Sequence, residues 1–351
     1  MDELHGMDHP RPRQPGRDEL FLKDILNAPA ELAAVVAAQR SVTARLRWVA
    51  ADYRRRRLIG MGSSAFAARD AAARWRREGL DAVAETASAS GLSAGSPETL
   101  AVVISASGRT PEVLEAAARH RAEGSKVVAL TADSQSPLAE AGDVVIPLRS
   151  TSVETAGIAS QTYRATVSGL LLLDTHRTAD EATADASRAP GALAALLDNA
   201  FEWQDAAADL LDTGRELHVL ADGFHAGLAE QAALMFREGP RIAAMPFDTG
   251  DWLHVGQYTL YPGDGVLLFA GSHADDEAIA TIHRKGGRVV VIGPAREGAD
   301  LVVPVTSDPD DWAVGILTAS AVAEMVAAAI WSRANAVSKG ESDDHGRAPG
   351  R

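Results

Sequence analysis

Two short segments of the sequence place hydroxyl side chains next to glycine. One is Gly62-Ser63-Ser64, and the other runs from Ser105 through Ser107 and Gly108 to Thr110. Each follows an apolar run and precedes a stretch typical of a helix, so its hydroxyl groups meet the unpaired N–H groups and positive dipole end of that helix. Such a loop can bind a phosphate group without a lysine. Glycine at position 108 would let the backbone approach the anion closely.

Either loop alone is weak evidence, because serine and glycine are also common in turns and helix caps. Two such loops after neighbouring strands make phosphate binding the stronger interpretation. In the second half of the chain Ala270-Gly271-Ser272 takes the place of the second loop, which predicts that only one half binds phosphate. Gly60-Met61-Gly62 begins like a dinucleotide fingerprint, but Ala65 replaces its third glycine, and the chain has no Walker A sequence.

The elements that must position these loops are short apolar strands alternating with helices. Continuous apolar runs predict buried parallel strands. They lie at 58–59, 100–104, 127–130 and 144–148 in the first half, and at 217–220, 266–269, 289–292 and 301–305 in the second. The intervening stretches predict helices, among them 65–77, 158–178, 189–212, 275–285 and 312–335. We therefore expect an α/β protein.

The two halves of the chain repeat the same plan. Arg77-Glu78-Gly79 corresponds to Arg237-Glu238-Gly239, and Lys126-Val127-Val128 corresponds to Arg288-Val289-Val290, at separations of 160 and 162 positions. This predicts an internal duplication of a Rossmann-like unit. Each unit would be a three-layer αβα sandwich with a parallel sheet. Right-handed crossovers would bring the loops after the strands to one sheet edge, where ligands of open sheets bind.

A length of 351 residues suits two domains of ordinary size. We expect a disordered leader at 1–17, N-terminal helices at 18–55 with a break at Asn27-Ala28-Pro29, a first domain at 56–180 and a second at 181–338. Residues 339–351 are charged and contain glycine, which predicts a disordered tail.

The composition excludes several classes of protein. The chain has no cysteine, so disulfides and thiolate metal sites are excluded. Its net charge of −14 argues against a nucleic-acid partner, and we expect the run Arg54-Arg55-Arg56-Arg57 to be a helix end. The sequence has no run of about 18 apolar residues and no signal peptide, so we expect a cytoplasmic protein without a membrane span. Neither a metal nor an organic cofactor is expected.

The loop pair, together with Ile158-Ala159-Ser160-Gln161-Thr162, resembles the SIS (sugar isomerase) domain. The duplicated arrangement over about 20–335 resembles the isomerase half of glucosamine-6-phosphate synthase. It is more similar still to the free-standing SIS-type aminosugar-phosphate deaminase/isomerases. The resemblance implies a homodimer with a hexose phosphate held in the first unit. The residues that it places around this ligand are Gly62, Ser63, Ser64, Ser105, Ala106, Ser107, Gly108, Thr110 and Ser160.

The resemblance also implies two catalytic residues in the second unit. Glu238 matches the family's isomerisation base, and His254 matches a histidine that opens the sugar ring across a dimer interface, at the family's spacing of 16 residues. A carboxylate near C1 and C2 can move a proton between them, and a histidine can protonate the ring oxygen near neutral pH. Without the resemblance, Glu238 would be read as a solvated helix end before a glycine cap, and His254 as a packing histidine beside Trp252. His225 is a weaker candidate.

The chain departs from the family's pattern at three places. Met235 replaces a lysine three residues before the glutamate, Val255-Gly256 follows the histidine in place of Gly-Pro, and only Lys339 is near the position of the family's tail lysine. The expected function is a phosphosugar aldose–ketose isomerase acting on an aminosugar 6-phosphate, with or without release of ammonia. Two alternatives remain open: a non-catalytic sugar-phosphate sensor, and an ammonia-dependent aminosugar-phosphate synthase without a glutaminase domain.

Overall fold

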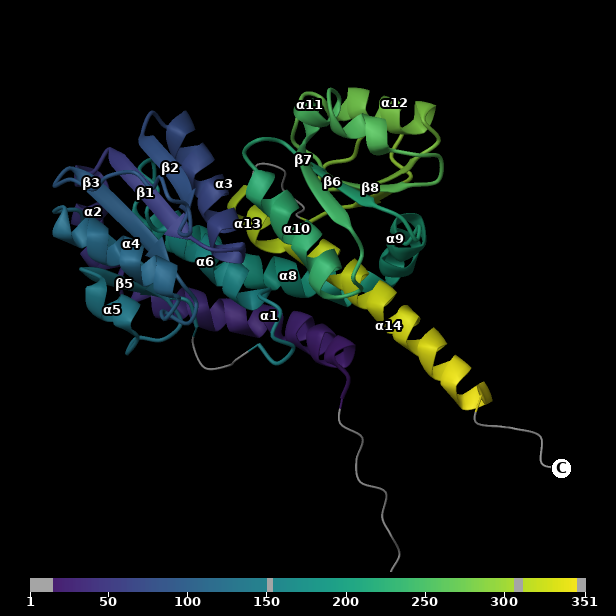
Figure 1. Ribbon diagram of the computed structural model, residues 1–351, viewed down its shortest axis with the longest axis horizontal. Helices are drawn as coiled ribbons and strands as arrows, with labels where there is room; N and C mark the ends of the chain where they lie inside the picture. Colours follow the sequence, from purple (N-terminus) through teal and green to yellow (C-terminus); the bar gives the residue numbers. More distant parts are fainter. Residues whose placement is uncertain (1–14, 150–153, 306–311, 346–351) are drawn as a thin grey trace, which may run out of the picture.

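The protein contains two parallel five-stranded sheets, each flanked by helices (Figure 1). The computed structural model describes residues 15–149, 154–305 and 312–345. The strand order is β2-β1-β3-β4-β5 in the first sheet and β10-β9-β8-β6-β7 in the second. Counted within each unit, the two orders are the same, which confirms the predicted α/β class and agrees with an internal duplication.

The first unit is built on β1 (Arg55–Gly60), β2 (Asp81–Thr86), β3 (Thr99–Ile104), β4 (Lys126–Thr131) and β5 (Val144–Pro147), with α1 (Arg17–Arg40), α2 (Thr43–Asp52), α3 (Ser63–Arg77), α4 (Pro111–Ala122), α5 (Pro137–Ala141) and α6 (Gln161–Leu171) around them. Helices α7 (Ala179–Ala186), α8 (Ala189–Asp198) and α9 (Gln204–Leu211) lead to the second unit. That unit contains β6 (Leu217–Ala221), α10 (Ala226–Glu238), β7 (Ala244–Asp248), α11 (Thr249–Trp252), η2 (Gly256–Thr259), β8 (Gly265–Phe269), α12 (Asp275–Arg284), β9 (Arg288–Ile292), β10 (Leu301–Val303), α13 (Trp312–Thr318) and α14 (Ser320–His345).

The sequence did not predict β2 and β7, which lie at the edge of their sheets beside β1 and β6. An edge strand is covered on fewer sides than a central one, so it does not need a continuous apolar run. Val83 in β2 and Met245 in β7 are indeed exposed, each with 37% of its surface accessible. The apolar pattern predicted central strands such as β3, which is buried throughout, and also the edge strands β5 and β10.

The arginine run is not the helix end that we expected. Residues Arg55 to Arg57 begin β1, and the Arg56 side chain is fully buried. Its Nη1 donates to the carbonyl oxygen of Leu173 at 2.5 Å, and its guanidinium lies 4.6 Å from the ring centre of Trp75. Burial lowers the pKa of Arg56 to about 10. The run therefore has a structural role in the core of the first unit.

The expected break at Asn27-Ala28-Pro29 is also absent, because α1 continues through Pro29. A proline inside a helix removes one backbone hydrogen bond. Here α1 packs against α6, α8 and α14 with Phe21, Ile25 and Leu32 buried, so tertiary contacts hold the helix together. The chain turns instead at 41–42, between α1 and α2.

Helices α13 and α14 contribute buried residues to the main hydrophobic core. The segment Trp312–Val337 is long and apolar enough to cross a membrane by composition, but 89% of its most apolar window is buried inside the protein. Helix α14 packs against α1, α9 and α10, as expected of a core helix. It runs to His345, so it takes in the first part of the segment 339–351 that the sequence suggested as a disordered tail. The expected leader 1–17 lies almost entirely outside the described residues.

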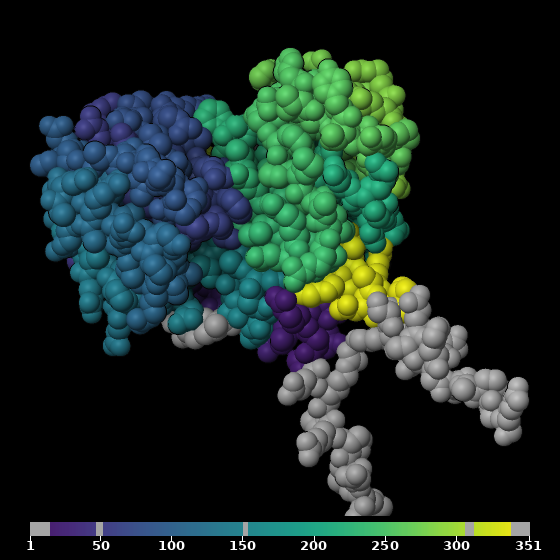
Figure 2. Space-filling model, viewed as in Figure 1, coloured from purple at the N-terminus to yellow at the C-terminus, as the bar shows by residue number. Residues whose placement is uncertain are grey.

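The two units lie side by side and share one hydrophobic core (Figure 2). Their contact is closest between α3 and α10, where a Cβ at Gly227 would lie 1.9 Å from the carbonyl oxygen of Phe66. The Gly227 N–H donates to Oδ1 of Asp70 at 2.6 Å, and Arg69 forms an ion pair with Glu230. These contacts fix the two sheets relative to one another.

Candidate functional site

The loop after β3 is held in shape by its own hydroxyl groups. The hydroxyl groups of Ser105 and Thr110 hydrogen-bond to each other at 2.9 Å, and the Gly108 N–H donates to Ser105 Oγ at 3.1 Å. The Arg109 N–H donates to Ser107 Oγ at 3.2 Å. Since Ser107 Oγ accepts this bond, its own hydrogen remains available for a ligand.

Gly108 has a clear structural reason to be glycine. Its φ of +63° lies in the left-handed region, and a Cβ there would lie 2.1 Å from Oγ of Ser136. Gly108 therefore lies close to the loop before α5. The sequence predicts a close approach of the backbone to an anion at Gly108, but the structure shows this close approach to a neighbouring loop. Gly62 also has a positive φ, of +49°, but open space surrounds the position of its missing Cβ.

The two hydroxyl loops open onto one cavity of about 300 Å³ at the carboxyl ends of β1 and β3. In the strand order of the first sheet this is the point where the chain changes direction, and ligands of open α/β sheets bind there. We call the five predicted hydroxyl side chains that line it, Ser63, Ser64, Ser105, Ser107 and Thr110, the hydroxyl cradle. Ala106 also lines the cavity, and none of the lining residues that the structure describes has a charged side chain.

Helix α6 adds three hydroxyl side chains that the sequence analysis did not assign to the site: Thr162, Tyr163 and Thr166. Thr166 Oγ1 donates to the carbonyl oxygen of Thr162 at 2.8 Å, and Thr162 Oγ1 donates to Glu154, so both point their hydrogens away from the cavity. Thr162 and Thr166 therefore offer no hydroxyl hydrogen to an anion in this cavity. Thr162, two residues after Ser160 in the motif, was the signal in the sequence that could have revealed this wall.

Glu154 occupies the N-terminus of α6. Its Oε1 accepts from the N–H groups of Ser160, Gln161 and Thr162 at 2.6, 2.6 and 3.2 Å, and its Oε2 accepts from Thr162 Oγ1 at 2.8 Å. Burial raises the pKa of Glu154, and these hydrogen bonds oppose the shift. Because the Glu154 carboxylate occupies the position that an anion would take at the N-terminus of α6, a phosphate in this cavity could bind only at the N-termini of α3 and α4.

Ser160 does not line the cavity. Its side chain is fully buried, and its Oγ has no hydrogen-bond partner among the described residues. The adjacent Ala159 does line the cavity, and its carbonyl oxygen accepts from Nε2 of Gln231 on α10 at 2.8 Å. The segment before α6 thus connects the cradle to the second unit.

Glu238 is the last residue of α10 and is half-buried. Burial raises the pKa of its carboxyl group, while the charges of Arg17, Arg241 and Arg237 act in the opposite direction. Glu238 does not line the cradle cavity. Met235, one turn earlier, is fully buried, and its Sδ accepts from Nε2 of Gln231 at 3.7 Å.

His254 is exposed and follows α11, which packs against β6, β7, α12 and η2. Figure 1 shows α11 and the C-terminal end of α10 at different ends of the second unit. Within one chain, the structure therefore does not bring His254 to Glu238 or to the cradle. Trp252 next to it is the packing residue, and its Nε1 donates to Nδ1 of His218 at 2.9 Å.

Comparison with known proteins agrees with this geometry. Residues 51–173 match the family model of the SIS domain. The matched residues run from the end of α2 to just past the end of α6, so the likeness to the SIS domain lies in the first unit. No curated protein matches the sequence.

Solved structures with the same fold cover both units. The C-terminal domain of glucosamine-fructose-6-phosphate aminotransferase from Francisella tularensis has a TM-score of 0.75 and 15% identity, over 91% of this chain and 99% of that one. Glucosamine-6-phosphate deaminase from Thermotoga maritima has a TM-score of 0.71 and 18% identity, over 90% and 95%. Tagatose-6-phosphate ketose/aldose isomerase from Escherichia coli has a TM-score of 0.71 and 16% identity, over 88% and 92%. These structures share the fold of this chain over 88–91% of its length, both units included.

The second unit differs from the first in the loops that would hold an anion. In the loop after β8, Oδ2 of Asp275 accepts from the N–H groups of Gly271 and Ser272 at 2.8 and 3.1 Å. In the loop after β6, Oδ1 of Asp222 accepts from the N–H groups of Phe224 and His225 at 3.0 and 3.1 Å. Internal carboxylates thus accept from these four N–H groups, which are therefore not available to a phosphate.

Proposed function

We propose that this protein is a phosphosugar isomerase that binds the phosphate of a hexose 6-phosphate in the hydroxyl cradle. The observation that carries the proposal is the cavity at the ends of β1 and β3, where the described lining residues include eight with hydroxyl side chains and none with a charge. Hydroxyl and N–H donors at two helix N-termini suit a phosphate group. The fold is shared with structures described as an aminotransferase, a deaminase and an isomerase of phosphosugars, which supports the substrate class.

In this proposal Glu238 moves the proton between C1 and C2 of the open-chain sugar. Its half-buried carboxyl group with a raised pKa is suited to take and return a proton. His254 of a second copy of the chain protonates the ring oxygen. The residues around His254 support a homodimer, because Val255 and Tyr258 expose 53% and 72% of their surface and offer apolar area for a second copy to cover.

The proposed substrate is an aminosugar 6-phosphate in the cytoplasm, and the isomerisation can be coupled to release of ammonia. Amino transfer is less well supported, because buried Met235 supplies no amine near Glu238. Lys339 has its side chain outside the described part of the chain. A non-catalytic sensor of sugar phosphates is the second candidate, favoured by the separation of Glu238 and His254 within one chain.

The experiment that tests the proposed function is a substrate panel. The protein is incubated with hexose 6-phosphates and 2-amino-2-deoxyhexose 6-phosphates, and aldose–ketose conversion is followed by NMR and ammonia by a coupled assay. Conversion of at least one compound, abolished in E238Q, is the expected result. If these compounds bind in a phosphate-dependent way but none is converted, the protein is a sugar-phosphate sensor and the isomerase proposal is wrong.

The dimer is tested by mixing two inactive variants. E238Q and H254N, unfolded and refolded together, should regain part of the wild-type activity, because mixed dimers then contain one site with both wild-type residues. Activity of the wild-type protein as an isolated monomer would contradict the shared site.

A further inference from the structure

A second, larger cavity of about 460 Å³ lies next to the cradle cavity. Four residues line both cavities, and two of them are alanines: Ala106, Ala159, Ser107 and Thr162. A ligand bound in the cradle would therefore lie beside the second cavity, with small side chains at part of the boundary.

The far side of this cavity is partly apolar. Leu32 and Val35 of α1 line it, and so does Leu148, which follows β5. A hexose phosphate held in the cradle would leave much of this space empty, since the cavity is larger than the cradle cavity itself. The space suits a substituent with a short apolar stem.

The charged side chains of the cavity differ in their partners. Arg109 forms an ion pair with Asp133 at 2.8 Å, and the buried Arg164 forms one with Glu324. Glu154 is held by the N-terminus of α6. Arg149, at the end of β5, is exposed and has no hydrogen bond or ion pair among the described residues.

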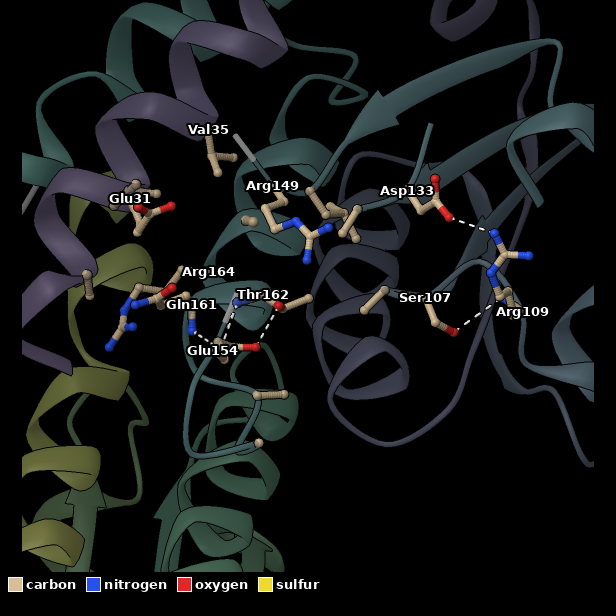
Figure 3. A pocket seen from close by; sticks show the side chains of 18 residues that line it. Glu31, Val35, Ser107, Arg109, Asp133, Arg149, Glu154, Gln161, Thr162 and Arg164 are labelled. Atoms are coloured by element: carbon tan, nitrogen blue, oxygen red, sulfur yellow. Dashed lines mark hydrogen bonds and ion pairs between the residues drawn. The ribbon is translucent and has the colours of Figure 1, made fainter. Parts of the chain in front are cut away.

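Figure 3 shows Arg149 extended into the cavity, with Glu31 to one side and the Arg109–Asp133 pair to the other. An anionic group is therefore favoured on the Arg149 side and disfavoured next to Glu31. The charge of Arg149 also acts on Asp133, which is already paired with Arg109, so the Arg149 guanidinium can still match the planar geometry and single charge of a carboxylate. The cradle contains no such cation, so it cannot provide this interaction.

We infer that the substrate carries a second anionic group, a carboxylate on a short substituent at the C2 nitrogen, and that Arg149 binds it. In a hexose ring C2 lies opposite C5, so a substituent at C2 points away from the phosphate on C6 and out of the cradle. Arg149 would then determine specificity without taking part in the proton transfer. This inference rests on the proposed function, because it needs the phosphate to be anchored in the cradle.

The test compares two probes by isothermal titration calorimetry: N-succinyl-glucosamine 6-phosphate, which carries a terminal carboxylate, and the neutral N-butyryl-glucosamine 6-phosphate. The wild-type protein should bind the succinyl probe about tenfold more tightly, the effect of one charge-assisted contact. R149A should bind the two probes equally, and R149K should keep part of the preference. R121A, which removes another exposed arginine whose Nη1 donates to Ala141, should behave as wild type.

Equal binding of both probes by the wild-type protein, or an unchanged preference in R149A, would overturn the inference and leave the proposed function standing. A second contrary result would come from adding free succinate at low concentration. If it removes the preference without displacing the butyryl probe, the cavity binds a separate anion and the inference is wrong. Glucosamine 6-phosphate serves as the control for the cradle. If none of the three phosphates binds, both the proposed function and the inference fail.

Discussion

At the scale of single residues, the hydrogen bonds within the cradle determine which hydroxyl hydrogens remain free for a ligand. Ser107 Oγ accepts from the Arg109 N–H, and the hydroxyl groups of Ser105 and Thr110 are paired with each other. Each arrangement leaves a hydroxyl hydrogen that can be donated to an anion. A phosphate dianion only accepts hydrogen bonds, so it can satisfy these donors without protonation.

Replacing both serines should weaken phosphate binding selectively. We expect S105A/S107A to bind hexose 6-phosphates at least about tenfold more weakly, since a hydrogen bond to a charged group contributes about 1.5–3 kcal/mol. Titration calorimetry measures this directly. S272A is the matched control, because Ser272 takes the corresponding place in the second unit, where Asp275 already accepts the backbone N–H. Unchanged affinity in the double variant would show that the phosphate binds elsewhere.

Gly108 should be far less tolerant of substitution than Gly62. G108A places a Cβ 2.1 Å from Ser136 Oγ in addition to the strain of a positive φ, whereas G62A meets only the strain. We expect G108A to lower the free energy of unfolding by about 2–4 kcal/mol and G62A by about 1 kcal/mol. Urea denaturation of both variants checks this. Equal losses would mean that the contact with Ser136 relaxes at no cost.

At the scale of elements, helix α6 contributes residues to both cavities of the first unit. Its N-terminal N–H groups are taken by Glu154, and its hydroxyl side chains form a wall of the cradle cavity. We expect E154A to destabilise the protein by about 1–3 kcal/mol, because it leaves buried N–H groups unpaired. E154Q keeps an acceptor oxygen and should lose less.

The exposed capping box of α7 provides the control for this prediction. Glu181 accepts from the Thr178 N–H at 2.7 Å, but it is exposed, so water can replace it in E181A. Chemical denaturation should therefore show a larger loss for E154A than for E181A. A smaller loss for E154A would mean that water reaches the α6 terminus.

Some of the helices and strands could be predicted from the sequence and others could not. Continuous apolar runs predicted the central strands, because a buried parallel strand needs apolar residues on both faces. The sequence did not predict the edge strands β2 and β7, because partly exposed strands need no continuous apolar run. It did not predict that α1 is continuous, because tertiary packing leaves no local pattern in the sequence. The two hydroxyl loops could be found because helix N-termini follow strands in a fixed order. Of the α6 wall, Thr162 could have been found from the motif, but Thr166 could not, because only the folded chain brings it to the same cavity as Ser105.

At the scale of the whole molecule, the contact between the two units contains a buried titratable group. Asp70 of α3 accepts the Gly227 N–H of α10, and burial raises its pKa from 3.8 to about 7 against the opposing effects of His225, this hydrogen bond and Arg74. Between these two pKa values the folded protein retains a proton that the unfolded chain has released. The free energy of unfolding should therefore fall as the pH rises through this range.

The variant D70N should remove most of this dependence, because asparagine keeps the acceptor for the Gly227 N–H and does not titrate. We expect the wild-type protein to lose up to about 1.4 kcal/mol of stability per pH unit between about pH 4.5 and pH 6, and D70N to lose much less. Denaturation at these two pH values is the measurement. D276N, which removes an exposed aspartate of α12, should keep the wild-type slope. An equal slope in D70N would place the titrating group elsewhere.

The placement of Glu238 and His254 stays a prediction, since a single chain holds them apart and only the proposed dimer unites them. The central claim is that Glu238 moves a proton between C1 and C2 of a sugar phosphate held in the cradle. The most direct test is deuterium exchange followed by NMR in heavy water with hexose 6-phosphates and their 2-amino analogues. The wild-type protein should introduce deuterium at C1 or C2 of one compound, and E238Q should lose this exchange by a factor of about 100 or more. Exchange at the wild-type rate in E238Q would contradict the account.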